Sequence, residues 1–266
     1  MSDRVLVQVN DGVADVRLNR EDKLNGLDRG MFEALDALGE RIAGDPGVRC
    51  VVLSGAGRSF CAGLDFLSFM GDDGDGPERS LLHRRPGAVA NQAQRAAQVF
   101  LEMKVPVVAA LRGHVYGGGL QIALAADIRI CHPEAKLSVM EIKWGLVPDM
   151  TGTQTLRRLV RLDVAKELTY TGRVISGREA ADLGLVTRLS DDPHAEARAL
   201  AAEIAGKSPD AIRAAKELLD RSGTVGFEEG LLLEEEVQKR IIGGANQLEA
   251  VQANFEKRAP QFADPQ

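Results

Sequence analysis

Two glycine-bearing segments are the first candidates for chemistry in this sequence. The segment 60–65 (FCAGLD) follows one apolar run, and the segment 113–119 (GHVYGGG) follows another and opens a helical pattern. Strand-to-helix turns of this kind expose backbone N–H groups that have no partner inside the helix. Two such groups converging on one oxygen would stabilise an oxyanion. Taken singly, each glycine segment is more typical of a tight turn or of close packing.

Other catalytic signatures are absent. The sequence contains no G-x-S-x-G, G-x-x-x-x-G-K-[ST], H-E-x-x-H or G-x-G-x-x-G motif, which argues against serine hydrolase, P-loop and dinucleotide-binding proteins. The four histidines lack the spacing of metal ligands, and His132, at a predicted strand end, is more typical of a structural histidine. We therefore expect no metal site.

The segments that must position these turns alternate between strand and helix patterns up to about residue 190. VLVQV (5–9) and VADVRL (13–18) flank an Asn-Asp-Gly turn and predict a β-hairpin. Apolar residues at helical spacing predict a helix from about Asp28 to Gly44. The polar, glycine-rich stretch from 66 to about 95 is typical of a lid or a mobile loop. Further predicted elements are strands at 50–55, 105–113, 128–132 and 185–190, and a helix at 117–127.

After about residue 190 the patterns are those of helices only. Four amphipathic segments are expected to be helical: 196–206, 208–222, 227–242 and 247–258. The sequence thus predicts a core of residues 1–190 and a helical region of residues 191–266. The apolar stripes of this region need a surface to pack on, which belongs either to another subunit or to the same domain. Periodicity favours neither alternative.

The composition narrows the class of protein. The chain has 266 residues, of which 44% are hydrophobic and 27% charged, with a net charge of −6. This is typical of a soluble globular protein, and the acidic balance argues against general nucleic-acid binding. No uncharged apolar run approaches the length of a membrane span, and the start MSDRVLVQVN has no features of a signal peptide. Three scattered cysteines favour reduced thiols, so we expect a cytoplasmic protein.

Several motifs in the same order resemble the crotonase (enoyl-CoA hydratase/isomerase) superfamily over nearly the whole chain. The matching stretches are 13–27 (VADVRLNREDKLNGL), 51–66 (VVLSGAGRSFCAGLDF), 104–130 (KVPVVAALRGHVYGGGLQIALAADIRI), 136–160 (KLSVMEIKWGLVPDMTGTQTLRRLV), 168–186 (LTYTGRVISGREAADLGLV) and 256–262 (EKRAPQF). The resemblance implies an α/β fold, the crotonase ββα spiral, followed by C-terminal helices that build trimers, often paired into hexamers. It implies an acyl-CoA thioester as substrate and no cofactor, because CoA is part of the substrate.

The resemblance gives the two glycine segments a joint role. It implies that the backbone N–H groups of Leu64 and Gly118 hold the thioester carbonyl of the acyl-CoA. Enolisation places negative charge on that oxygen, and preorganised amides stabilise this charge where water is excluded. Because the backbone acts, the side chain of Leu64 is expected to matter little.

Proton transfer is assigned in the same way. In hydratases of this family, two glutamates move the protons. The resemblance places the second at Glu141, whereas the position of the first holds Gln121. Glutamine can orient a water molecule or the thioester through hydrogen bonds, but it cannot accept or return a proton. Hydration by two glutamates is therefore not expected.

Asp149 has two interpretations. An aspartate ahead of the segment TGTQTLRRLV is typical of a helix cap. The resemblance instead implies a second acid facing the acyl chain, as in dienoyl-CoA isomerases, where a glutamate and an aspartate at the positions of Glu141 and Asp149 move protons along a conjugated chain. CoA-thioester dehalogenases use that aspartate as a nucleophile, but they carry an aromatic residue at the position of Glu141. The isomerases also have an acid at the position of Gln121, so neither match is complete.

The resemblance also implies a set of substrate-binding positions. The turn of residues 22–24 and Ala62 match places where the family binds CoA largely through its backbone, and Lys257 matches a lysine that meets the CoA phosphates, sometimes from a neighbouring subunit. A solvated helix face is an equally good interpretation of Lys257. Asn254 stands where the family commonly has Phe, which leaves the adenine contact open. The full expected set is Asp22, Lys23, Leu24, Ala62, Leu64, Asp65, Tyr116, Gly118, Gln121 and Lys257.

These observations predict an acyl-CoA enzyme, with double-bond isomerisation of an enoyl- or dienoyl-CoA as the first choice and Glu141 and Asp149 as its acids and bases. Hydration of a 2-enoyl-CoA by Glu141 alone is the alternative. A non-catalytic acyl-CoA-binding protein is a third possibility, which Gln121 supports and the Glu141–Asp149 pair opposes. No nucleic-acid or membrane partner is expected. The acyl chain length cannot be deduced from these motifs.

Overall fold

The main sheet explains why the predicted buried strands are continuously apolar. The structure is a computed structural model that describes residues 4–69 and 80–265. In the described residues, the main sheet has the order β1 (Val5–Asn10), β2 (Val13–Leu18), β3 (Cys50–Gly55), β4 (Val107–Leu111), β6 (Ile128–Cys131) and β9 (Arg188–Leu189). The predicted hairpin β1–β2 is antiparallel, and all later neighbours are parallel.

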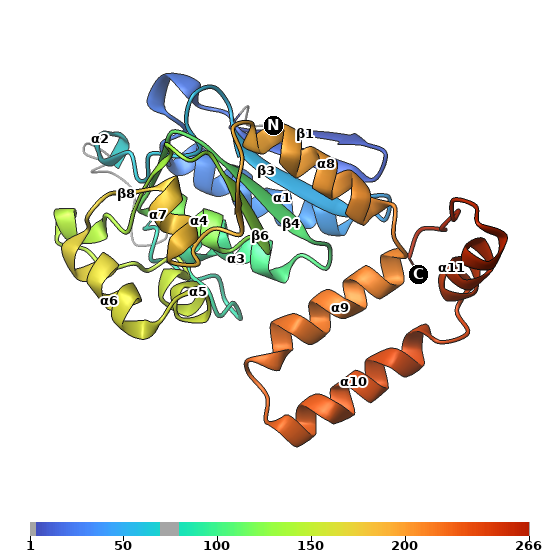
Figure 1. Cartoon of the computed structure of the whole chain (residues 1–266). Helices are drawn as coiled ribbons and strands as arrows, with labels where there is room; N and C mark the ends of the chain where they lie inside the picture. The colour runs from blue at the N-terminus through green and yellow to red at the C-terminus, as the bar shows by residue number, and fades with distance from the viewer. Residues whose placement is uncertain (1–3, 70–79, 266) are drawn as a thin grey trace.

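Helices cover both faces of this sheet (Figure 1). Val51 and Leu53 of β3 belong to the larger core, which includes the apolar faces of α1 (Arg29–Ala43) and α3 (Gln92–Glu102). Cys50 and Val52 point the other way, toward Ala197 and Ala201 of α8 (Pro193–Ala205). Because successive strand residues alternate between the faces, both faces must be apolar.

A second, smaller sheet includes part of the segment 113–119, where the sequence predicts only a turn. It consists of β5 (His114–Tyr116), β7 (Lys136–Ser138) and β8 (Ile175–Ser176). β5 is parallel to β7, and β8 is antiparallel to β7. Strands of two or three residues are too short to show a strand pattern, so their pairing is decided by tertiary contacts. β5 leads directly into α4 (Gly118–Leu124), so this sheet fixes the start of α4.

The predicted lid falls partly on residues 70–79, which lie outside the described residues, so the lid stays a prediction. On either side of them lie α2 (Phe66–Phe69) and the start of α3, where Asn91 forms a capping box with Gln94. The helix therefore begins before residue 95, where the sequence reading ends the loop. The remaining short elements are η1 (Glu21–Lys23), η3 (Glu141–Trp144), α5 (Gly152–Leu159), α6 (Leu162–Thr171) and α7 (Gly177–Asp182).

The last three helices extend away from the sheets (Figure 1). They are α9 (Pro209–Ser222), α10 (Phe227–Ile241) and α11 (Ala245–Glu256), and α9 begins with the predicted Ser208 cap and Pro209. α9 and α10 pack against each other, whereas α8 packs on the main sheet. Several large apolar side chains of the protruding helices are exposed: Leu219, Phe227, Leu232, Leu248 and Phe255. α8 therefore packs on its own domain, whereas the later helices leave apolar surface uncovered, and packing on another subunit stays a prediction.

Two further expectations concern the environment of the protein. Cys50, Cys61 and Cys131 are buried free thiols, as the odd, scattered cysteines predict. In the described part of the chain, no helix is both long enough and apolar enough to cross a lipid bilayer. The cytoplasmic location and the division of the chain at residue 190 stay predictions.

Candidate active site

The two turns singled out in the sequence lie side by side. The Cys61 N–H donates to the His114 carbonyl over 3.0 Å, and the Tyr116 N–H donates to the Cys61 carbonyl over 3.0 Å. These bonds join the two segments as an isolated parallel bridge. Leu64 and Gly118 follow on the two segments and line the same cavity. The structure therefore brings together the two backbone positions that the resemblance pairs.

Glycine is required where the two turns approach each other. Gly63 has a φ of +89°, and a β-carbon at this position would lie 2.9 Å from the carbonyl oxygen of Tyr116. A β-carbon on Gly119 would lie 2.7 Å from the carbonyl oxygen of Cys61. Both distances are shorter than a carbon–oxygen van der Waals contact, so any larger residue would push the turns apart.

The backbone amides of Leu64 and Gly118 are available to a ligand. The Leu27 N–H donates to the Gly63 carbonyl over 2.8 Å, and the Asp65 N–H donates to the Leu27 carbonyl over 3.0 Å, so the chain is held on both sides of Leu64. Within residues 4–69 and 80–265, no backbone hydrogen bond uses the N–H of Leu64 or of Gly118. Two fixed, unused donors at one cavity are the geometry that an oxyanion hole needs.

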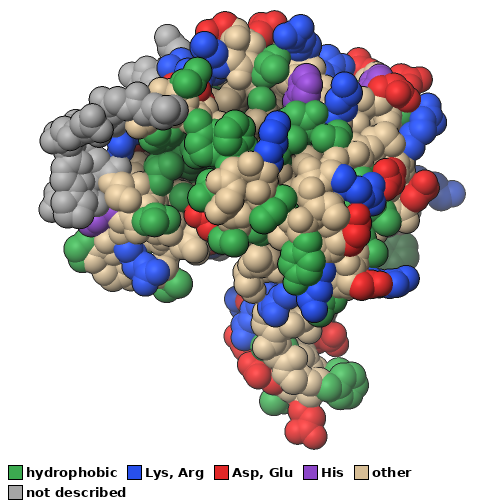
Figure 2. Space-filling view, turned by 90° about the vertical axis from the view of Figure 1, so that its left-hand side faces the viewer, with side chains coloured by type: hydrophobic (Ala, Val, Ile, Leu, Met, Phe, Trp, Pro, Cys, Tyr) green, Lys and Arg blue, Asp and Glu red, His purple; other side chains and the backbone are tan. Residues whose placement is uncertain are grey.

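The cavity at these turns is small and mostly apolar. Its volume is about 290 Å³. Hydrophobic side chains gather on the face of the molecule that carries α2, α6 and α7 (Figure 2). Among the described residues, Glu141 and Asp149 are the charged side chains that line the cavity. The other side chains along its wall are Phe32, Ala62, Leu64, Phe66, Leu81, Leu82, Ala93, Tyr116, Gln121, Met140, Trp144, Leu146, Val147 and Met150.

Gln121 is locked in one orientation by three hydrogen bonds. Its Oε1 accepts from the Met150 N–H over 2.7 Å and from the Gly152 N–H over 3.0 Å. Its Nε2 donates to Oε1 of Glu141 over 2.6 Å. An amide flipped by 180° would set its NH₂ against two backbone donors, so these contacts fix which end faces Glu141. Gln121 is 2% exposed, and its hydrogen bond to Glu141 holds that neighbouring side chain.

Glu141 has one satisfied and one unsatisfied oxygen. Oε1 accepts the bond from Gln121, whereas Oε2 is buried and has no hydrogen-bond partner among the described residues. Burial raises the pKa of the Glu141 carboxyl, and the negative charge of Asp149 raises it further, against the hydrogen bond from Gln121, which lowers it. A carboxyl with a raised pKa and a free oxygen is suited to exchange a proton with a ligand.

Asp149 is not a helix cap, so that interpretation of the sequence is wrong. α5 begins after Thr151, whose side chain makes no capping bond, and the oxygen of Gln121 accepts from the Met150 and Gly152 amides instead. Asp149 lines the cavity beside Glu141, and burial raises the pKa of its carboxyl. The structure thus leaves this carboxylate free to face a ligand.

The expected CoA-binding residues fall into three groups. Ala62 and Tyr116 line the cavity with Leu64, Gly118 and Gln121. The turn of Asp22, Lys23 and Leu24 lies outside the cavity wall but adjoins it, because the Ala62 N–H donates to the Leu24 carbonyl over 3.0 Å.

Asp65 and Lys257 lie elsewhere. The Asp65 carboxylate pairs with Arg20 over 2.7 Å, so its side chain is engaged in an ion pair of the turn. Lys257 is exposed at the end of α11, in the protruding helical region, away from α2 (Figure 1). A single chain therefore does not bring Lys257 to the cavity.

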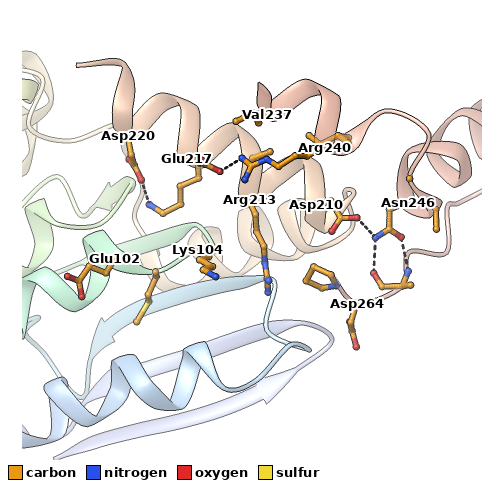
Figure 3. Close-up of a pocket in the computed structure, with 18 of the residues that line it drawn as sticks. Glu102, Lys104, Asp210, Arg213, Glu217, Asp220, Val237, Arg240, Asn246 and Asp264 are labelled. Carbon is orange, nitrogen blue, oxygen red and sulfur yellow. Dashed lines mark hydrogen bonds and ion pairs between the residues drawn. The ribbon is translucent and has the colours of Figure 1, made fainter. Parts of the chain in front are cut away.

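A larger cavity lies between the protruding helices and the end of α3. Its volume is about 730 Å³, and charged side chains line it (Figure 3). Several of these have a partner on the same wall: Lys216 pairs with Asp220 over 3.2 Å, Arg240 with Glu217 over 2.6 Å, and Asp210 accepts from Asn246 over 2.8 Å. Groups satisfied in this way have little capacity left for a reacting ligand.

An aromatic pair that the sequence does not predict lines the same cavity as Glu141. The rings of Phe66 and Trp144 lie with their centroids 4.4 Å apart. Trp144 is the only tryptophan in the chain, and it follows Glu141 by three residues. That spacing puts both residues on one side of a helical turn, which is the signal that could have identified it.

Comparison with known proteins agrees with this geometry. A family model described as "Enoyl-CoA hydratase/isomerase" matches residues 8–265. A Bacillus subtilis protein named "Probable enoyl-CoA hydratase" is 36% identical over 241 residues, which cover 90% of each chain. The mouse mitochondrial methylglutaconyl-CoA hydratase is 30% identical over 267 residues, covering 97% of this chain and 82% of that protein.

The fold is similar to that of solved structures as well. The crystal structure of an enoyl-CoA hydratase from Bacillus anthracis superposes with a TM-score of 0.89 at 33% identity. The superposition covers 98% of this chain and 100% of that chain. The likeness therefore includes the protruding helices as well as the two sheets.

Proposed function

This chain belongs to the enoyl-CoA hydratase/isomerase family, the crotonase superfamily, and from that premise we propose that it isomerises a double bond in an enoyl- or dienoyl-CoA. The fold is the one that the resemblance predicts, and the chain is an enzyme acting on acyl-CoA thioesters. One observation carries the proposal. A buried glutamate with one free oxygen, a second carboxylate and two free backbone amides line a single small cavity.

The first step is the formation of an enolate. The free Oε2 of Glu141 takes a proton from a carbon of the acyl chain, and the electron pair of that C–H bond moves toward the thioester carbonyl. The N–H groups of Leu64 and Gly118 donate to the oxygen as its charge develops. A raised pKa makes Glu141 a stronger base than an ordinary glutamate once it is ionised.

The second step returns a proton to a different carbon. Either Glu141 gives back the proton that it took or Asp149 supplies its own, and the double bond then stands in a new position. Two carboxyls whose charges interact and whose pKa values are both raised can divide the roles of acid and base. No water molecule is consumed in this sequence.

Gln121 is the reason for preferring isomerisation over hydration. Hydration by the two-glutamate mechanism needs a second proton-active group to activate water. Gln121 cannot accept a proton, its Oε1 is occupied by the Met150 and Gly152 amides, and its Nε2 donates to Glu141. We assign it to positioning Glu141, because its bond to Oε1 leaves Oε2 as the free oxygen.

Hydration of a 2-enoyl-CoA by Glu141 without a second glutamate remains the second candidate. The names of the relatives favour it, since both curated relatives described above are named as hydratases. In this mechanism Glu141 would deliver a proton and also direct the water molecule, with Asp149 as the remaining carboxylate of the cavity.

Ultraviolet absorbance separates the two candidates. We expect turnover of a 3,5-dienoyl-CoA and slow or no loss of the crotonyl-CoA double bond. Rapid hydration of crotonyl-CoA with no dienoyl-CoA turnover would reverse the ranking. Tight binding of acyl-CoA without proton exchange at Cα in deuterated water would instead establish a non-catalytic binding protein.

We also propose that the enzyme assembles into a trimer, or a hexamer built from two trimers. The exposed apolar side chains of α9, α10 and α11 support this assembly: Leu219, Phe227, Leu232, Leu248 and Phe255. Lys257 lies in the same region, so assembly is the way in which it could reach the cavity of a neighbouring subunit. Light scattering after size-exclusion chromatography tests the state, and a monomer at micromolar concentration would contradict it.

A further inference from the structure

We propose that a cavity at the start of α8, here called the α8 cavity, is a second binding site and takes a phosphate group. Its volume is about 260 Å³. The polar side chains on its wall are those of Arg17, Ser54, Arg112, Asp192 and His194. None of these residues belongs to the described wall of the cavity that contains Glu141. The α8 cavity is therefore separate from the catalytic cavity, and its role does not depend on the proposed isomerisation.

The α8 cavity lies where neighbouring strands of the main sheet end. On β3, Val52 packs under α8, and the next residue on the same face of the sheet is Ser54. On β4, Ala110 packs under α8, and Arg112 follows two residues later, directly after the strand. Ser54 stands opposite Arg17 of β2 in the parallel register. In open α/β sheets, ligands bind outside the carboxyl ends of the strands, which is where this cavity lies.

The hydroxyl of Ser54 indicates that a ligand is missing. Ser54 is 5% exposed, and its Oγ is buried without a hydrogen-bond partner among the described residues. A buried hydroxyl without a partner is unfavourable, so a protein retains it where it has a use or an absent partner. Because Ser54 forms part of the cavity wall, a ligand oxygen at the inner end of the cavity would supply that partner.

The cationic side chains of the α8 cavity also have unused hydrogen-bonding groups. Arg17 gives Nε and one Nη to Asp15, so its other Nη is free among the described residues. Nε2 of His194 lies 3.1 Å from the same carboxylate, and Nδ1 has no partner in the described part of the chain. The guanidinium of Arg112 makes no hydrogen bond with described residues, and it lies 3.7 Å from the Asp192 carboxylate. The two guanidinium groups therefore offer free donors at one cavity.

The two acids near the α8 cavity are already engaged with protein groups. Burial raises the pKa of Asp15, but hydrogen bonds from His194 and Arg17 lower it by more, so the ionised carboxylate holds both side chains in place. The Asp192 carboxylate caps α8 by accepting from the Ala195 N–H over 3.2 Å. On the described wall, two arginines and a histidine therefore face a single aspartate that is used as a cap.

Phosphate is the anion that matches these donors. The donors come from β2, from the end of β3, from the residue after β4 and from the start of α8, so they surround the cavity from separate elements. A phosphate group presents several strongly accepting oxygens in a tetrahedral arrangement and carries up to two negative charges. A carboxylate has two oxygens in one plane and would leave part of this set unused. Arginine also binds phosphate oxygens through paired, charge-assisted hydrogen bonds.

Calorimetry on the full chain tests the class of ligand, with inorganic phosphate, methyl phosphate and acetate as probes in a buffer free of phosphate. We expect saturable binding of a phosphate probe and binding of acetate that is weaker by about 10-fold or more. Tighter binding of methyl phosphate would support the site and identify phosphomonoesters as its ligands. Tighter binding of inorganic phosphate would support it with the free ion as ligand. No saturable phosphate binding, or equal affinity for acetate, would overturn the proposal.

Arg112→Gln locates the binding in the α8 cavity. Loss of this guanidinium should weaken phosphate binding by about 10-fold or more, because charge-assisted hydrogen bonds are lost. Arg112 is preferred to Arg17, whose removal would also take a partner from Asp15. Arg198→Gln is the matched control, since Arg198 is an exposed arginine of α8 that does not line the cavity. Equal weakening by both variants would place the phosphate elsewhere and refute the site.

Ser54→Ala should have two opposite effects. It should weaken phosphate binding, and it should raise the unfolding temperature in the absence of phosphate, because it removes a buried hydroxyl that has no partner. A serine with a merely structural role would lower the unfolding temperature and leave phosphate binding unchanged, which would contradict the proposal.

The phosphate site and the proposed isomerase can fail separately. Arg112→Gln should retain acyl-CoA turnover in phosphate-free buffer, because its side chain does not line the catalytic cavity. Phosphate binding that depends on Arg112 would support the site even if no acyl-CoA were turned over. Turnover without any phosphate binding would retain the isomerase and reject the site.

Discussion

The small cavity that contains Glu141 and the larger cavity beside the protruding helices, here called the groove, differ in whether their polar groups have hydrogen-bond partners. The groove is the larger, about 730 Å³ against about 290 Å³. Lys216, Arg240 and Asp210 in the groove each have a partner (Figure 3), although Nε of Arg213 there has none among the described residues. In the smaller cavity, a buried carboxylate oxygen and two backbone amides are unused.

This difference shows that volume alone does not locate the chemistry, because the smaller cavity is the one that combines an unpaired carboxylate oxygen with two unused backbone amides. Leaving a buried polar atom without a partner costs about 1–3 kcal/mol, so a protein retains such an atom only where it has a use or an absent partner. The atoms without partners in the smaller cavity belong to residues that line the same cavity. In the groove, Arg240 and Glu217 join α10 to α9, and Asp210 and Asn246 join α9 to α11.

The strongest test of this contrast is Glu141→Gln. Removal of the base should lower kcat by about 10²–10⁴-fold, the range usual for a general acid–base group. The matched control is Glu217→Gln in the groove, which breaks an ion pair with Arg240 and should leave kcat unchanged. Steady-state kinetics on the same acyl-CoA measures both. Equal rates for the two variants would remove Glu141 from the mechanism.

A smaller loss is expected at the oxyanion turn. A β-carbon on Gly118 would lie 2.9 Å from Cδ1 of Leu27 and from Sδ of Met150, so Gly118→Ala must displace the amide. Loss of one such donor lowers kcat by about 10²–10³-fold. Leu64→Ala keeps its backbone N–H and should retain most of the activity. If Leu64→Ala proved as damaging as Gly118→Ala, side-chain packing would be the cause, and the amide assignment would lose its support.

Asp149→Asn should lower the rate of isomerisation more than the rate of hydration. We expect a loss of about 10–100-fold in dienoyl-CoA isomerisation, since one partner of a two-carboxyl relay is removed. Hydration of crotonyl-CoA, if present, should fall less, because Glu141 would carry it. An equal effect on both substrates would show that Asp149 only shapes the cavity.

Gln121→Glu converts the site to the two-glutamate arrangement. One oxygen would still accept from Met150 and Gly152, while the other would stand against Oε1 of Glu141, where Gln121 now donates over 2.6 Å. Two carboxylates so close cannot both ionise, so the pair should hold a proton to higher pH. We expect a gain in hydration and an acidic limb of the pH–rate profile shifted upward. An unchanged profile would mean that Gln121 does not set the titration of Glu141.

The smallest effect concerns stability. The pKa of Glu141 is raised in the folded protein. Its contribution to the free energy of unfolding is therefore fully present below the unfolded pKa of about 4.5, and it decreases as the pH rises through the folded pKa. Glutamine does not titrate. Glu141→Gln should therefore become more stable relative to the original chain between pH 4 and pH 7. Urea unfolding at both pH values measures this, and a constant difference would contradict the raised pKa.

The sequence alone predicts many of the residues that line the cavity, but not all of the contacts that they make with each other. Leu64, Gly118, Gln121, Glu141 and Asp149 were all singled out, and all line one cavity. The cap interpretation of Asp149 was plausible from local pattern and proved wrong, because the oxygen that accepts from the Met150 and Gly152 amides comes from Gln121, 29 and 31 residues away. The Phe66–Trp144 contact likewise joins two distant segments, and a local sequence pattern cannot predict such a contact.

The sequence determined the order of the elements, the buried strands and the residue types available for chemistry, since these depend on periodicity, turn residues and motif order along the chain. The tertiary structure decided which of those residues act together. Parallel pairing sets the Leu64 and Gly118 turns side by side, and three hydrogen bonds orient Gln121 so that one oxygen of Glu141 stays free. Such contacts arise from packing between distant segments. The distance and orientation between two groups, and not their residue types, decide whether an atom has a hydrogen-bond partner.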